Sequence, residues 1–300
     1  MGMFRNKFKV KPFTPFARRN IGVVGLGLIG ASVAKSLVQN ERAINVIGVD
    51  VLQENIDLAL KDHVIAFGHT DINILRGCEI IFIAVPLART AETISKVFSV
   101  VSDTAIISDV AGVKGKIFAS LPKGIRFVSG HPMAGKETSG FAVSDGDVLM
   151  NCPYILIRDI NTVETDFNAV KSVINIFTDN VIETDARTHD LAVAKSSHLP
   201  HMLAYTLSSY VFTDEDAVRA TAGGVKDMTR VAKTEPALWV DTCRDNKKAL
   251  SEAMDDYIRE LTLIKTYIDN GDLTALETYF AKARELRLAL EKSDTDKGKI

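Results

Sequence analysis

The histidine at position 131 stands in a segment whose residue types suit proton transfer. It lies in SGHPMAGKETSG (residues 129–140), at the end of an apolar run that is typical of a buried strand. A neutral imidazole has an unperturbed pKa of about 6.5, so it can accept a proton near neutral pH. Because a lone histidine is more often structural, its position alone leaves both a structural and a catalytic role open.

Two cations later in the chain are candidates for holding an anion. Lys226 and Arg230 are four residues apart and are expected on one face of a helix. The planar guanidinium of Arg230 matches a carboxylate with two hydrogen bonds, and a charge-assisted bond contributes about 1.5–3 kcal/mol. The alternative is a pair of solvated surface cations that bind no ligand.

The segment before these cations is expected to be a helix with one stripe that faces a cleft. The stripe comprises Asp190, Ala194, Ser197 and His201. Pro200 should kink the helix at this point. His201 therefore lies on a stripe that can face the cleft, whereas His198 can equally be a core histidine that supports it.

A glycine-rich turn near the amino terminus indicates a dinucleotide site. GVVGLGLIGAS (residues 22–32) places Gly25, Gly27 and Gly30 in the order G-x-G-x-x-G between a predicted strand and a predicted helix. The first glycine permits the tight turn, the second lets the backbone approach a pyrophosphate, and the third brings the helix against the sheet. The free N–H groups and the dipole of the helix then receive the phosphate charge. A plain glycine turn is the alternative interpretation.

Asp50 ends the second predicted strand, twenty residues beyond Gly30, where an acidic side chain meets the adenosine ribose in this kind of site. A carboxylate that faces a 2′-phosphate at ~4 Å costs about 4 kcal/mol per unit charge at an effective dielectric of about 20. The sequence therefore predicts NAD rather than NADP. The expected cofactor contacts are Gly25, Gly27, Leu28, Ile29, Gly30, Asp50, Val85 and Pro86, the last two from AVPL (residues 84–87) after the third strand.

Short apolar runs and amphipathic stretches alternate from Ile21 onward and position these residues. The apolar runs cover residues 21–25, 45–50, 79–85, 105–110, 126–131, 154–159 and 180–185. Such runs are typical of strands that are buried on both faces. Helical segments over residues 30–39 and 53–60 separate the early strands. The pattern therefore predicts an α/β fold with a Rossmann-type doubly wound, mostly parallel sheet.

After about Thr184 the strand signals stop, and an all-helical second domain is predicted. One buried helical stripe is expected from the spacing of Leu250, Met254, Tyr257, Ile258, Leu261, Ile264 and Ile268. Asn270 and Gly271 end that helix, and Asp272 can cap the next one. The expected domains are a basic extension (1–20), a dinucleotide-binding domain (21–184) and a helical substrate-binding and dimerisation domain (185–300). An apolar stripe left over in a domain of this size favours a homodimer.

The composition indicates a globular protein of near-neutral charge. Hydrophobic residues make up 46% of the 300 residues, and 36 basic against 38 acidic side chains leave a formal net charge of −2. We therefore expect no nucleic acid partner and, without a long apolar run, no membrane span. The scattered cysteines, Cys78, Cys152 and Cys243, predict neither a disulfide framework nor a metal site and suit a reducing cytoplasm. The basic first twenty residues are interpreted as a solvated extension, with organelle targeting as the alternative.

Five motifs resemble, in order and spacing, those of the prephenate and arogenate dehydrogenases of tyrosine biosynthesis. They are GLGLIG (25–30), AVPL (84–87), HPMAG (131–135) with Glu137, SSHLPH (196–201) and GGVKDMTR (223–230). The resemblance covers roughly residues 21–290, and HPMAG and SHLPH are its specific parts. It implies a Rossmann domain followed by a dimerising helical domain. It also implies oxidative decarboxylation of prephenate to 4-hydroxyphenylpyruvate, or of arogenate to tyrosine.

The same resemblance implies roles for single residues. His131 matches the catalytic histidine, which takes the proton from the ring hydroxyl as hydride leaves the same carbon for the nicotinamide. Arg230 matches the residue that grips the ring carboxylate, and His201 matches a second substrate-site histidine. An ionic network at the pocket mouth of some relatives involves the positions of Glu137, Asp190 and Lys226. No catalytic role is assigned to His63, His69 or His189.

One position departs from the family pattern. Relatives commonly have D-x-x-S-x-K after the fourth strand, whereas this chain has DVAGVK (109–114), with Gly112 in place of a serine that helps to orient the histidine. Either a water or another hydroxyl replaces that serine, or turnover is weaker. The prediction is a prephenate dehydrogenase. The alternatives are an arogenate dehydrogenase, another two-domain dehydrogenase of the β-hydroxyacid type, and a catalytically idle nucleotide sensor.

Overall fold

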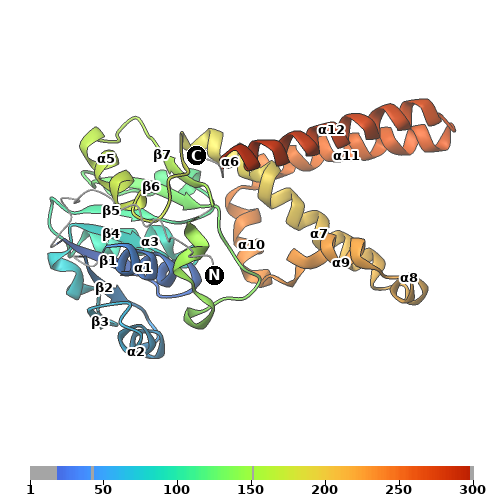
Figure 1. Ribbon diagram of the computed structural model, residues 1–300. Helices are drawn as coiled ribbons and strands as arrows, with labels where there is room; N and C mark the ends of the chain where they lie inside the picture. Colours follow the sequence, from blue (N-terminus) through green and yellow to red (C-terminus); the bar gives the residue numbers. More distant parts are fainter. Residues whose placement is uncertain (1–18, 42–43, 151, 298–300) are drawn as a thin grey trace, which may run out of the picture. The chain divides into compact units, whose positions relative to one another are not determined.

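The computed structural model describes residues 19–41, 44–150 and 152–297 of the chain (Figure 1). The chain forms two compact units, residues 1–247 and 248–300. The basic extension expected over residues 1–20 lies outside the described residues, apart from Arg19 and Asn20. Asn20 already belongs to the first strand.

An eight-stranded sheet forms the centre of the first unit. Its strands are β1 (Asn20–Val24), β2 (Asn45–Val49), β3 (Phe67–His69), β4 (Ile80–Ile83), β5 (Ile106–Asp109), β6 (Phe127–Pro132), β7 (Tyr154–Ile157) and β8 (Val181–Thr184). Their order across the sheet is β3-β2-β1-β4-β5-β6-β7-β8. All neighbouring pairs are parallel except β6 and β7, which run antiparallel. The predicted doubly wound, mostly parallel sheet is confirmed.

The edge strand β3 was not predicted from the sequence. It has three residues, and Phe67 at its start is 62% exposed. A strand this short, with one neighbour and a solvated side chain, lacks the apolar run that revealed the other seven. The seven strands that were predicted agree with the observed ones to within a few residues.

Helices cover both faces of the sheet and bury a core on each. The helices of this part are α1 (Leu28–Asn40), α2 (Gln53–Lys61), α3 (Leu87–Phe98), α4 (Gly115–Phe118) and α5 (Glu164–Ile174). Side chains of α1, α2 and α5 pack into one core, and those of α3 and α4 pack into the other. Neighbouring strand residues alternate between the two cores, as Val23 and Val24 do in β1. This two-sided burial explains the continuous apolar runs in the sequence.

Every described element after Thr184 is helical, as predicted. In the first unit these are α6 (Ala186–Val193), a π-helical turn (Ala194–His198), α7 (Leu199–Val211), α8 (Glu215–Arg219), α9 (Gly223–Thr229), a 3-10 helix (Arg230–Lys233) and α10 (Pro236–Asp245). A kink was expected at Pro200; the structure has a π-helical turn that ends two residues before it, and α7 begins at Leu199. Proline has no N–H to continue the hydrogen-bond ladder, and π turns of this kind often occur at functional sites.

Two long helices, α11 (Lys247–Asp269) and α12 (Leu273–Lys297), form the second unit. Gly271 adopts a φ of +65° in the connection, and the Asp272 carboxylate accepts a hydrogen bond from the backbone N–H of Ala275 (3.0 Å). The predicted helix end and cap are thus confirmed. No described helix is both long and apolar enough to cross a membrane.

The apolar stripe of α11 is only partly buried within the chain: Leu250 is 4% exposed, whereas the stripe was expected to be buried throughout. Ile258, Leu261 and Ile268 are 55%, 49% and 60% exposed. On α12, Phe280 and Leu286 are 55% and 65% exposed. The helical spacing was recognised correctly, but spacing alone does not tell whether the same chain or a second copy covers an apolar face.

Candidate active site

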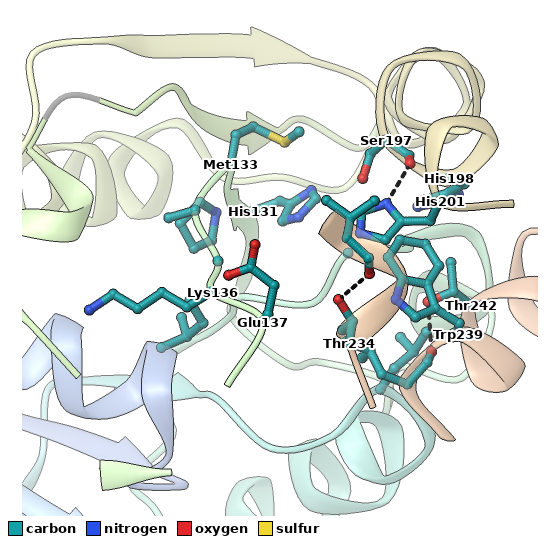
Figure 2. Close-up of a pocket in the computed structure, with 18 of the residues that line it drawn as sticks. His131, Met133, Lys136, Glu137, Ser197, His198, His201, Thr234, Trp239 and Thr242 are labelled. Atoms are coloured by element: carbon teal, nitrogen blue, oxygen red, sulfur yellow. Dashed lines mark hydrogen bonds between the residues drawn. The ribbon is translucent and has the colours of Figure 1, made fainter. Parts of the chain in front are cut away.

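A pocket of about 390 Å³ opens at the carboxyl ends of the parallel strands, within the first unit (Figure 2). Residues that follow or end β1, β4, β5 and β6 line one side: Ile29, Leu87, Val110, Gly112 and His131. The other side includes Ser197, His198 and His201 from the π turn and α7, and Trp239 and Thr242 from α10. Open α/β sheets bind their ligands at this edge.

His131 lies near the end of β6 and is held from both sides. Its backbone is in register with Ile155 of the antiparallel neighbour β7. Its ring nitrogen Nδ1 lies 2.9 Å from Nε2 of His189, whose side chain is buried on α6. Nδ1 of His189 in turn lies 2.8 Å from Oδ1 of Asp190. Three side chains from two elements therefore form a continuous chain of hydrogen bonds that ends in the pocket.

The Asp190 carboxylate is fixed by backbone donors. Its Oδ1 accepts a hydrogen bond from the N–H of Lys114, and its Oδ2 accepts one from the N–H of Gly115, both at 2.9 Å. In the sequence, Asp190 was expected in an ionic network at the pocket mouth. In the structure it does not line the pocket, and instead joins the start of α4 to His189.

The surroundings of His131 keep its imidazole neutral. Burial, followed by the positive charge of Lys114 and by His189 and His198, lowers the pKa of His131 well below its usual value. The Lys114 ammonium is fully buried and pairs with Asp109 at 2.7 Å. It also donates to the carbonyl oxygen of Gly130 at 2.5 Å, next to His131 in the chain. A neutral imidazole with a free nitrogen can act as a base at neutral pH.

The buried ion pair of Asp109 and Lys114 holds the end of β5 against β6. The second oxygen of Asp109, Oδ1, accepts a hydrogen bond from Ser129 Oγ at 2.6 Å, and Oδ2 also accepts from the N–H of Ala111 at 2.9 Å. Removing one partner of such a pair leaves an uncompensated buried charge, which typically destabilises a protein by ~3–5 kcal/mol. Asp109 and Lys114 of the DVAGVK motif therefore fix the backbone next to His131.

His201 lines the pocket and is held there by a hydrogen bond and an aromatic partner. Its Nδ1 donates to the carbonyl oxygen of Ser197 at 2.9 Å. In the neutral ring, Nε2 therefore carries no proton and can accept a hydrogen bond. Its ring stacks on Trp239, with 3.7 Å between the ring centroids and an interplanar angle of 26°. In Figure 2, His131 and His201 face the same space from opposite sides. The structure thus brings together two histidines that are 70 residues apart in the sequence.

His198 has a structural position beside this wall of the pocket. It is 3% exposed, and its Nδ1 lies 3.2 Å from the amide nitrogen of Asn246. The same amide nitrogen donates to the backbone oxygen of Asp190 at 2.8 Å. Burial lowers the pKa of His198 to about 4, so this ring is neutral and accepts from Asn246.

Arg230 and Glu137 form an ion pair at the pocket, and both residues line it. Arg230 lies at the start of a short 3-10 helix that follows α9, whereas Lys226 lies within α9. The two cations are therefore not on one regular helical face. Lys226 is exposed and is not among the residues that line the pocket. The sequence analysis expected the Arg230 guanidinium to bind a carboxylate of the substrate. In this structure the guanidinium is paired with the carboxylate of Glu137 instead.

The glycines of the loop after β1 have the steric roles that the G-x-G-x-x-G order predicts. A Cβ atom on Gly25, which has a φ of +90°, would lie 2.4 Å from the backbone oxygen of Ala84. A Cβ on Gly30 would lie 1.8 Å from the backbone oxygen of Gly25. A Cβ on Gly27 would meet no described atom within 4 Å. This open space at the amino end of α1 leaves room for a pyrophosphate to approach the backbone.

Asp50 lies at the end of β2 and is 8% exposed. Its Oδ2 accepts from the N–H of Leu26 at 2.6 Å and its Oδ1 from the N–H of Leu52 at 2.8 Å. The carboxylate therefore joins the glycine loop to the strand end where a ribose would lie. Of the other expected cofactor contacts, Leu28, Ile29 and Val85 are half-buried and Pro86 is exposed, at the starts of α1 and α3.

The strand order, the glycine loop and the pocket at the strand ends define a nucleotide-binding protein of the Rossmann class. Its sheet is followed in the same chain by a helical region. The chain belongs to the prephenate dehydrogenase family. Residues 33–183 match the family model for the prephenate dehydrogenase nucleotide-binding domain. Residues 185–294 match the model for the prephenate dehydrogenase dimerization domain. The family predicted from the five motifs is confirmed.

Relatives with known names agree with this assignment. The chain is 31% identical over 275 residues to a prephenate dehydrogenase of Bacillus subtilis, covering 88% of this chain and 74% of the relative. It is 29% identical over 291 residues to a cyclohexadienyl dehydrogenase of Zymomonas mobilis, covering 93% and 98%.

Two solved structures are similar over most of their length. Prephenate dehydrogenase from Aquifex aeolicus, in complex with hydroxyphenyl propionate and NAD+, has a TM-score of 0.87 and 27% identity, covering 92% of this chain and 100% of that one. Synechocystis arogenate dehydrogenase has a TM-score of 0.77 and 29% identity, covering 89% and 98%. The named relatives thus include enzymes of prephenate and of arogenate.

Sequence reasoning missed two residues of this site. His189 was given no role, because nothing in the sequence shows that α6 brings it against β6. Trp239 was not considered, although it is the single tryptophan of the chain and closely follows the GGVKDMTR motif.

Proposed function

We propose that this chain catalyses the oxidative decarboxylation of prephenate to 4-hydroxyphenylpyruvate with NAD. The observation that carries the proposal is the imidazole of His131, neutral and hydrogen-bonded at Nδ1, at the pocket edge of the nucleotide-binding sheet. Its Nε2 is the atom that would take the proton of the ring hydroxyl.

The residues of the glycine loop fit a dinucleotide. Gly27 has open space beside it, whereas Gly25 and Gly30 have no room for a side chain. The carboxylate of Asp50 disfavours a 2′-phosphate by charge repulsion, which supports NAD over NADP. When bound, NAD supplies the acceptor for the hydride that leaves the ring carbon bearing the hydroxyl. Ile29 lines the substrate pocket and also follows the glycine loop, so the two sites share a boundary.

The reaction balances with one proton held by His131. The hydroxyl proton moves to Nε2 as the carbon–hydrogen bond of the same ring carbon breaks with its electron pair. The carbon–carbon bond to the ring carboxylate then breaks, carbon dioxide leaves, and the ring becomes aromatic. The electrons of that bond leave a phenolate oxygen, to which His131 can return the proton. The imidazole ends the cycle neutral, as it began.

Arg230 and His201 are proposed to hold the substrate. The ring carboxylate would replace Glu137 as the partner of the Arg230 guanidinium, because a carboxylate of either kind satisfies the same donors. Nε2 of His201 is the acceptor that would meet the substrate, because Nδ1 donates its proton to Ser197. Lys226, outside the pocket lining, is proposed to act only through the long-range field that attracts a dianion.

Arogenate is the second candidate substrate, for one reason. It carries an ammonium group where prephenate has a keto group, and Glu137 places a carboxylate in the pocket lining. Glu137 could pair with that ammonium once Arg230 binds the ring carboxylate. The test is the rate of NADH formation with prephenate and with arogenate, each with NAD and with NADP. Activity with neither substrate would exclude both candidates.

The functional division of the chain is proposed to fall near residue 184, where the sheet ends. Residues 21–184 would then bind the dinucleotide and residues 185–300 the substrate and a second copy. The exposed apolar side chains of α11 and α12, together with the match to a dimerization domain, support a homodimer.

A further inference from the structure

We propose that His189 and Asp190 are positioning residues that keep the ring proton of His131 on Nδ1, so that Nε2 is the nitrogen left to accept a proton. The inference rests on the proposed function for its kinetic consequence but not for its structural part. His189 does not line the pocket and would act only through His131.

The direction of the hydrogen bonds follows from Asp190. Both of its oxygens accept from backbone N–H groups, those of Lys114 and Gly115, and such donors cannot be reversed. Oδ1 also meets Nδ1 of His189 at 2.8 Å, so that nitrogen must carry a proton and donate it. A neutral His189 then has a bare Nε2, which can only accept.

The same reasoning extends to the catalytic ring. His131 Nδ1 lies 2.9 Å from the accepting Nε2 of His189 and must therefore carry the proton. The remaining nitrogen of His131, Nε2, is left with a lone pair. It points toward Gly112, since a Cβ atom on that glycine would lie 3.5 Å from it, and Gly112 lines the pocket. The Asp190 carboxylate, acting through His189, thus determines which of its two neutral tautomers His131 adopts.

This arrangement satisfies the donors of the three side chains. The His189 side chain is fully buried, and its two ring nitrogens meet Asp190 and His131. The buried ammonium of Lys114 is paired with Asp109. A buried network in which each donor has an acceptor holds its side chains in one arrangement.

The position of His189 depends on the start of α6. The carboxylate of Asp185 caps that helix by accepting from the N–H of Thr188 at 2.9 Å, and the backbone oxygen of Asp185 accepts from the N–H of His189 at 2.9 Å. The first turn of α6 is therefore rigid, and the ring of His189 starts from a fixed backbone. A base that is held in its reactive orientation needs no rearrangement at the moment of proton transfer.

Two variants of His189 distinguish the effect of its hydrogen-bond acceptor from the effect of its bulk. In His189→Gln the side-chain oxygen can still accept from His131, whereas His189→Leu fills similar space without an acceptor. Asp166→Asn serves as a control for loss of a buried carboxylate, since Asp166 pairs with Arg126 and does not line the pocket.

The first measurement is the imidazole nitrogen NMR spectrum of the free, isotope-labelled protein, with the His131 signals assigned by their loss in His131→Asn. We expect the proton on Nδ1 in the wild type and in His189→Gln, and mainly on Nε2 in His189→Leu. The second is steady-state kinetics. We expect kcat to fall roughly 10- to 100-fold in His189→Leu, by analogy with the loss of an outer partner of a metal-bound histidine, with KM for prephenate unchanged. His189→Gln should recover most of that loss, and Asp166→Asn should have the wild-type kcat.

A wild-type His131 with its ring proton on Nε2 would overturn the inference, and so would equal losses in the Gln and Leu variants. If His189→Leu does not fold, the wild-type and His189→Gln spectra still decide the tautomer. If the wild type does not oxidise prephenate, the proposed function fails, but the tautomer measurement remains valid because it needs no substrate.

Discussion

Nε2 of His131 lies 3.5 Å from the point where a Cβ atom would stand on Gly112. That is an ordinary van der Waals distance, so a small side chain fits there without moving the ring. The serine that the family resemblance leads us to expect at this position would bring its hydroxyl within reach of the reactive nitrogen. Gly112, in the loop after β5, offers no such hydroxyl.

The first prediction concerns this position. Gly112→Ser should raise kcat by about two- to tenfold, because a neutral hydrogen bond contributes about 0.5–1.5 kcal/mol to holding the ring in one orientation. Gly112→Ala adds the same bulk without the hydroxyl and should not raise kcat. Kinetics with saturating prephenate and NAD test this. An equal gain in the alanine variant would assign the effect to packing.

The second prediction concerns the base itself. His131→Asn should lower kcat by a factor on the order of 10²–10⁴, the usual contribution of a positioned acid or base, and leave NAD affinity unchanged. Turnover and NAD titration calorimetry on the same preparation provide the two readouts. Wild-type turnover would remove His131 from the mechanism.

The third prediction is a pair of opposite effects across the pocket. Arg230→Ala should raise KM for prephenate roughly 10- to 100-fold, since a charge-assisted bond contributes about 1.5–3 kcal/mol. Glu137→Gln should lower KM, because it releases the guanidinium that Glu137 now neutralises. The control is Lys233→Ala, an exposed cation of the same 3-10 helix as Arg230. If Glu137→Gln raises KM, Glu137 contacts the substrate instead of competing with it.

The fourth prediction concerns stability in mild acid. Burial lowers the pKa of His198 to about 4 and also lowers the pKa of His131 and His201. The unfolded chain binds protons at these rings below about pH 6.5 while the folded chain does not, so the free energy of unfolding should fall as pH drops from about 6.5 toward 4. His198 alone accounts for roughly 3 kcal/mol by pH 4.

Urea denaturation across this pH range measures the effect. His198→Gln, which can still accept from Asn246, removes one titrating ring and should show a shallower fall. A slope that is identical in the variant and the wild type would contradict the assignment to His198.

The fifth prediction concerns the second unit. Leu261→Glu together with Ile268→Glu should convert a dimer to a monomer, because charges replace side chains that are 49% and 60% exposed on one apolar stripe. Light scattering after gel filtration gives the mass. Lys265→Gln, at an exposed cation of the same helix, should keep the dimer. A monomeric wild type would refute the proposed dimer.

Features that depend on neighbouring residues were readable from the sequence. The G-x-G-x-x-G order specified a turn in which Gly30 has no room for a side chain, because the clashing atom is the backbone oxygen of Gly25 in the same loop. Continuous apolar runs revealed seven of the eight strands, and the short edge strand β3 escaped because it has little to bury. The end of α11 at Gly271 was equally local.

Contacts between distant segments were decided only by the tertiary structure. Nothing in the spacing of His131 and His189, 58 residues apart, shows that their rings meet, or that Asp190 turns to the backbone of Lys114 instead of the pocket mouth. Periodicity placed Leu261 and Ile268 on one stripe but did not show that they are exposed within the chain. A sequence pattern records which side chains avoid water or carry charge. Which partner each one meets depends on how whole elements pack, and that is a property of the folded chain as a unit.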